Sequence, residues 1–81
     1  MDIKILGIGC PKCKRVEELA KQAAHQVGVE ATFDHVTEMN KIMEYPILGT
    51  PGLVIEGKVV SSGRIPQVQE IVNWIKEAQS E

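Results

Sequence analysis

The sequence predicts an α/β fold with the element order β-α-β-α-β-β-α, in which helices flank a four-stranded mixed sheet. Residues 2–8 form a short apolar run rich in β-branched side chains, which is typical of a strand. From Val16 the apolar residues recur at helical spacing, and Glu56-Gly57 separates two apolar runs as a tight hairpin turn would. Strands joined through a helix are expected to lie parallel, whereas the hairpin adds an antiparallel pair. With 81 residues, the chain is expected to form a single domain, residues 1–81.

The first helix is expected to begin at Pro11 and to end at Gly28. Proline suits the first helical position because its missing N–H would have no partner there, and glycine is a common C-terminal cap. The apolar residues of one helical face are Val16, Leu19, Ala20, Ala23, Ala24 and Val27. The small alanines predict close packing against a neighbouring element.

The middle of the chain predicts a strand and a short helix. Residues 29–34 alternate between apolar and polar, as in a half-buried strand. Thr37 is expected to cap a short helix that carries Met39, Ile42 and Met43 at helical spacing. We interpret these methionines as core-filling residues.

The remaining residues predict a loop, a hairpin and a final helix. Residues 49–52 are expected to form the loop, 53–55 and 58–60 the two hairpin strands, and 61–65 a connector. Pro66 is expected to open the last helix. The apolar face of that helix is Val68, Ile71, Val72, Ile75 and Ala78.

The composition excludes several classes of protein. Nine Lys and Arg against eleven Asp and Glu give a net charge of −2, which argues against a nucleic-acid partner. No apolar run approaches the roughly 20 residues that a membrane-spanning helix needs. Because residues 1–4 lack the pattern of a secretory signal, we expect a cytoplasmic location. We also expect a monomer.

The two cysteines, Cys10 and Cys13, have three alternative roles. A structural disulfide over so short a loop would contribute little, about 2 kcal/mol in the chain-entropy model. A structural zinc site needs four ligands, and the spacing of His25 and His35 does not match a zinc finger. A two-thiolate site for a soft ion remains possible on spacing alone. The third role is a redox pair.

The surroundings of the two cysteines favour the redox pair. Cys10 directly precedes the helix, and a helix N-terminus next to basic residues stabilises a thiolate, the reactive form of cysteine. Lys12, Lys14 and Arg15 lie in this first turn, where cations are otherwise unfavourable. Their presence is explained by a nearby thiolate or an anionic partner, although a solvated run of charge is the alternative.

The order of these motifs resembles the thioredoxin superfamily, and in particular its small glutaredoxin-like redox-active disulfide proteins of prokaryotes. The resemblance rests on residues 7–13, Gly-Ile-Gly-Cys-Pro-Lys-Cys, and on residues 49–51, Gly-Thr-Pro, before a hairpin and a closing helix. It implies a thioredoxin-like fold. It also implies a thiol–disulfide oxidoreductase that reduces or exchanges disulfides in partner proteins.

The resemblance also implies individual roles. Cys10 would be the nucleophile and Cys13 the resolving thiol, so that a Cys10–Cys13 disulfide would be the redox group, with no other cofactor and no metal. Pro51 would be a cis proline facing the cysteines, and Thr50 would pair with an extended substrate. The partners would be disulfide-containing proteins and a reductase or low-molecular-weight thiol. Arg64 stands where glutaredoxins carry an acidic residue that holds glutathione.

Two other functions use the same residues. A strand, a glycine loop and Cys-x-x-Cys at a helix start also resemble small carriers of copper or zinc. Those carriers end in a strand, whereas this sequence ends in a predicted helix. A binding module whose disulfide controls partner docking is the other alternative.

Overall fold

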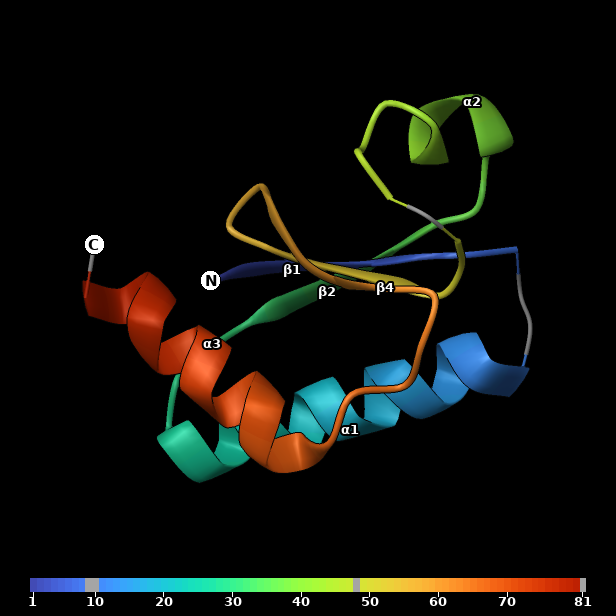
Figure 1. Ribbon diagram of the computed structural model, residues 1–81. Helices are drawn as coiled ribbons and strands as arrows, with labels where there is room; N and C mark the ends of the chain where they lie inside the picture. The colour runs from blue at the N-terminus through green and yellow to red at the C-terminus, as the bar shows by residue number, and fades with distance from the viewer. Residues whose placement is uncertain (9–10, 48, 81) are drawn as a thin grey trace.

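The elements follow the predicted order along the chain. The computed structural model describes residues 1–8, 11–47 and 49–80, and Figure 1 shows the arrangement. The elements are β1 (Asp2–Leu6), α1 (Pro11–Val27), β2 (Thr32–Val36), α2 (Met39–Ile42), β3 (Gly52–Ile55), β4 (Lys58–Ser62) and α3 (Val68–Ser80). The fold is thioredoxin-like, as the sequence predicts.

The four strands form one mixed sheet in the order β2-β1-β3-β4. The α1 connection makes β1 and β2 parallel, whereas β3 pairs antiparallel with both β1 and β4. At the hairpin, Glu56 and Gly57 have φ angles of 51° and 79°, the two positive values that a type I′ turn requires. At the end of the sheet opposite to the hairpin, β1 ends before α1, and β3 begins.

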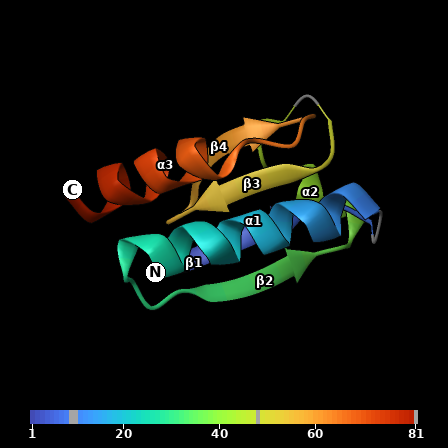
Figure 2. The same cartoon turned by 90° about the horizontal axis from the view of Figure 1, so that it is seen from below.

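Helices cover the two faces of the sheet unequally. Figures 1 and 2 show α1 and α3 side by side on one face, and Figure 1 shows α2 on the other. The main core lies beneath α1 and α3 and includes Ile5, Leu53 and Ile71. A smaller buried cluster of Leu6, Ile42 and Val54 lies on the α2 face. None of the helices in the described part of the chain is both long and apolar enough to cross a membrane.

The second strand begins three residues later than predicted. Gly28, with a φ of 82°, ends α1 as expected, but the N–H groups of Gly28 and Val29 both donate to the carbonyl of Ala24 at 2.9 and 3.2 Å. Val29 is therefore still bound to the last turn of the helix. Pairing starts where Thr32 donates to the Met1 carbonyl at 2.8 Å.

The prediction that methionines fill the core around α2 is wrong. Ile42 is 2% exposed, but Met39 and Met43 are 51% and 74% exposed. The expected cap is also wrong, because the helix begins after Glu38 and no side chain caps it. A helix of four residues can bury only one of its sides, so a single apolar residue reaches the sheet.

The connector before α3 lies two residues later in the chain than predicted, at residues 63–67. β4 continues to Ser62, and α3 begins at Val68 rather than at Pro66. The N–H of Gln67 donates to Glu70 Oε1 at 3.2 Å, which is the Glu half of a capping box. This side-chain acceptor places the helix start at the residue after Gln67.

Candidate functional site

Cys13 lies in the first turn of α1 and faces the interior. Its side chain is 1% exposed and belongs to the main core with Val16 and Ile5. Pro11 is the first residue of the helix, as predicted, so Cys13 occupies the third position. Cys10, the predicted nucleophile, lies outside the described residues. The structure therefore has a buried thiol in the first turn of a helix, where backbone N–H groups have no partner within the helix itself.

Gly7 joins Cys13 to the loop that carries Thr50. A Cβ atom at Gly7 would overlap the Cys13 sulfur, and it would lie 3.5 Å from Cys13 Cβ and 3.9 Å from Thr50 Cβ. The Gly7 N–H donates to the Val36 carbonyl at 3.0 Å, so the end of β1 is fixed to β2. Only glycine leaves room for the sulfur at this point. The contact brings together residues 7, 13 and 50 from three separate segments.

The Thr50-Pro51 segment has the geometry that the resemblance implies. Its peptide bond is cis, Pro51 is buried and Thr50 is exposed. The Pro51 carbonyl accepts a hydrogen bond of 3.0 Å from the N–H of Gly63. A Cβ atom at Gly49 would lie 3.7 Å from Gly63 Cα, so the loop and the β4–α3 connector pack closely. The connector thus supports the loop beside Cys13.

The basic residues at the start of α1 are exposed to solvent. Arg15 Nη1 pairs with Glu18 Oε2 at 3.3 Å, so its charge is partly compensated. In residues 1–8, 11–47 and 49–80, no ion pair joins Lys12 or Lys14 to a carboxylate. The first turn of α1 contains no acidic residue. This part of the surface is therefore positive although the whole chain is slightly negative.

Arg64 is held by Glu70 at the start of α3. The two Nη atoms of Arg64 donate to the two carboxylate oxygens of Glu70 at 3.1 and 2.6 Å. Hydrogen bonds from Arg64 and from the Gln67 N–H, with the charge of Arg64, lower the pKa of Glu70 from 4.5 to about 2. Because Arg64 follows Gly63, this fork anchors the connector that binds Pro51.

Glu70→Gln should make the free energy of unfolding depend less steeply on pH below about pH 5. A carboxylate whose pKa is lowered by folding stabilises the native state above pH 4.5, and this contribution is lost as the pH falls towards about 2. Chemical denaturation between pH 2 and pH 6 measures the slope. Arg64→Gln should flatten it in the same way, and both effects should shrink in high salt. An unchanged slope in Glu70→Gln would contradict this role of the pair.

An apolar groove lies beside the Thr50 loop. It has a volume of about 410 Å³, and we call it the methionine groove; its lining is Met39, Ile42, Met43, Tyr45, Ile47, Gly49 and Thr50. Among the described residues, the exposed large hydrophobic side chains are Ile8, Met39, Met43 and Ile65. All four lie on segments at the Cys13 end of the sheet. The sequence contained the methionines but no signal for their exposure.

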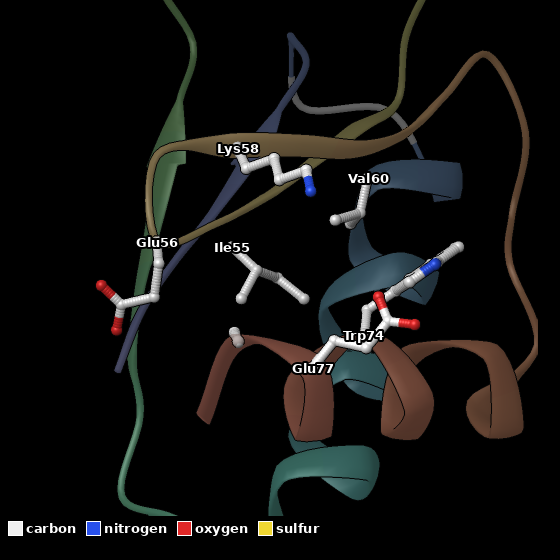
Figure 3. Close-up of a pocket in the computed structure, with 7 residues that line it drawn as sticks. Ile55, Glu56, Lys58, Val60, Trp74 and Glu77 are labelled. Atoms are coloured by element: carbon white, nitrogen blue, oxygen red, sulfur yellow. The ribbon is translucent and has the colours of Figure 1, made fainter. Parts of the chain in front are cut away.

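Two other features lie away from this end. A small cavity of about 40 Å³ lies between the β3–β4 hairpin and α3, where Figure 3 shows Lys58, Val60 and Trp74 around it. His25 is exposed, and His35 pairs with Glu17. Within the described ranges, no three His, Cys, Asp or Glu side chains gather as a metal site.

Comparison with known proteins agrees with the fold. A mixed sheet, a buried cysteine on the first helix and a cis proline beside it define a small protein of the thioredoxin-like class. A family model described as "Thioredoxin domain" matches residues 1–76. The thioredoxin of Methanocaldococcus jannaschii is 39% identical over 74 residues, which cover 91% of this chain and 85% of that protein. The thioredoxin of Methanothermobacter thermautotrophicus is 35% identical over 71 residues, which cover 88% and 92%.

This chain therefore belongs to the thioredoxin family. Its activity is of the thiol–disulfide oxidoreductase kind. On the sequence alone, the cysteine spacing and the Thr-Pro motif had already indicated the same family.

Proposed function

We propose that the protein reduces or exchanges disulfides in other proteins through the dithiol of Cys10 and Cys13. The observation that carries the proposal is the buried Cys13 thiol in the first turn of α1, packed against Gly7, which in turn lies close to Thr50. A buried thiol is poorly placed to attack an external disulfide, whereas it suits a second, intramolecular step. This assigns the first attack to Cys10 and the resolving step to Cys13. Lys12, Lys14 and Arg15 favour the thiolate of Cys10 by their charge.

The reaction consists of two exchange steps. The Cys10 thiolate attacks one sulfur of the substrate disulfide; a Cys10–substrate bond forms, and the other substrate sulfur leaves as a thiolate and takes a proton. The Cys13 thiolate then attacks the Cys10 sulfur and releases the second substrate thiol. The substrate gains two electrons and two protons, and the protein is left with a Cys10–Cys13 disulfide. A dithiol reductant returns it to the starting state.

The surface around the site supports a protein as substrate. Exposed apolar side chains gather at this end of the sheet, and such patches are typical of macromolecular contacts. Thr50 is exposed on the loop, where its backbone would pair with an extended segment of the substrate. Small thiols would leave most of this surface unused. We therefore propose disulfide-containing proteins as the substrates.

A protein reductase suits the site better than glutathione as the electron donor. Arg64 stands where glutaredoxins place an acid, and its guanidinium is held in a fork by Glu70. Position 64 therefore offers no carboxylate to the amino group of glutathione. Transient catalytic disulfides are the usual kind in the cytosol, so we keep the cytoplasm as the proposed location.

A redox titration tests the proposal. Equilibration in dithiothreitol buffers, followed by alkylation and mass measurement, should show both thiols changing together in one two-electron transition. We expect a midpoint within the range of about −120 to −270 mV that dithiols of this fold span. The reduced protein should also turn over a protein disulfide with dithiothreitol as the final reductant. Two thiols that never link, together with tight binding of copper(I) or zinc, would instead indicate a metal carrier.

A further inference from the structure

The Thr50-Pro51 loop is bound to the connector at the edge of the sheet. Gly52 and Ser62 are register partners where β3 begins and β4 ends. One step further, the Gly63 N–H donates to the Pro51 carbonyl at 3.0 Å. Gly63 then turns the chain away with a φ of 75°, a conformation that suits glycine. The position of the loop therefore depends on how firmly the connector is held.

The start of α3 holds the connector through one carboxylate. Glu70 accepts two hydrogen bonds from Arg64, at 3.1 and 2.6 Å, and a third from the Gln67 N–H at 3.2 Å. A bidentate pair fixes orientation as well as distance. Ile71, the next residue of α3, is fully buried in the main core, so the anchor itself is rigid. Figure 1 shows the connector as the orange trace from β4 to the start of α3.

The needs of the helix alone do not explain Arg64. A cap for α3 requires only Glu70 and the Gln67 N–H, as in one half of a capping box. Cations are unfavourable near the start of a helix, where the carboxylate of Glu70 is favourable by itself. Arg64 directly follows Gly63, so the fork fixes the residue next to the one that binds the loop.

We propose that Arg64 and Glu70 are positioning residues for the disulfide exchange. Their fork fixes the connector, and the connector holds the Thr50-Pro51 loop through the Gly63 N–H. The inference rests on the proposed function and adds two residues that touch neither the substrate nor the reacting sulfurs. A substrate that pairs along the loop needs this alignment, whereas a small disulfide that reaches only the thiolate does not.

Hydrogen exchange at the Gly63 amide tests whether the fork holds the connector. In Arg64→Gln this amide should exchange about fivefold faster, as expected for the loss of an exposed ion pair of good geometry. Glu70→Gln should have the same effect, although its side-chain oxygen can still cap Gln67. The core amides of β1 and β3 should keep their rates. An unchanged rate at Gly63 in both variants would overturn the inference.

The ratio of two activities tests the positioning role. We compare kcat/KM for insulin, a protein disulfide, with kcat/KM for a small aromatic disulfide. The ratio should fall about fivefold in Arg64→Gln and equally in Glu70→Gln, mainly through a higher KM for insulin. The double variant should fall no further, because both changes remove the same interaction. A general loss of folded protein would lower both activities alike and leave the ratio unchanged.

Lys21→Gln is the matched control. It breaks an exposed ion pair of 3.2 Å with Glu17 on α1, and it should keep the ratio. The two test variants change the net charge in opposite directions, so an equal fall excludes simple attraction or repulsion of the substrate.

Several results would decide against the inference. A ratio that is unchanged in both single variants would overturn it, even if the Gly63 amide exchanges faster. Losses that add in the double variant, or ratios that move in opposite directions in the two single variants, would also overturn it. If the wild type reduces neither insulin nor the small disulfide, the proposed function itself fails.

Discussion

Cys13→Ser is expected to stop the reaction after its first step. With Cys10 intact, the thiolate still attacks the substrate, but no second thiol is present to release it. The variant should therefore accumulate a covalent complex in which one substrate sulfur is bonded to Cys10. Non-reducing electrophoresis and mass spectrometry of the intact protein detect this complex. Dithiothreitol should separate it by reducing the disulfide.

Cys10→Ser is the matched control for the trapping experiment. Its remaining thiol at position 13 is 1% exposed, so it should form no complex and the rate should fall to that of the uncatalysed exchange. Alkylation of the native variant should be slow and should become fast on unfolding. A complex trapped through Cys13 in this variant would reverse the assigned order of attack.

Gly7→Ala is expected to damage both stability and activity. The added methyl group would overlap the Cys13 sulfur, and the hydrogen bond from Gly7 to Val36 prevents the strand from moving away. Overpacking of this kind typically costs about 1–3 kcal/mol. The displaced sulfur would also lose its alignment for the resolving step. Urea denaturation measures the first effect, and the lifetime of the mixed disulfide measures the second.

Gly49→Ala provides the comparison for stability. Its Cβ would lie 3.7 Å from Gly63 Cα, which is an ordinary contact. We expect its unfolding free energy to stay within about 0.5 kcal/mol of the wild type. If Gly7→Ala is as stable as Gly49→Ala and resolves mixed disulfides at the normal rate, then Gly7 does not position Cys13.

Local patterns predicted most of the fold correctly. The buried face of α1 follows directly from the spacing of its apolar residues, because a 3.6-residue period places them on one side. Pro11 and Gly28 set the limits of α1 through their own backbone restrictions. The Thr-Pro loop and the cysteine spacing identified the family through resemblance, not through geometry.

The incorrect predictions concern features that depend on distant residues. The start of β2 is set by hydrogen bonds to Ala24 and Met1, which alternation within the strand does not encode. The exposure of Met39 and Met43 depends on how much of α2 reaches the sheet. The contact of Gly7 with Cys13 arises only when β1 and α1 are packed together. No periodicity contains such information.

The two buried clusters lie on opposite faces of the sheet, with Cys13 in one and the floor of the methionine groove in the other. A library that randomises Met39 and Met43 would therefore leave the packing of α1 and α3 intact. Such a library could be selected for binding to different disulfide-containing proteins, and the two cysteines that carry out the exchange would stay the same.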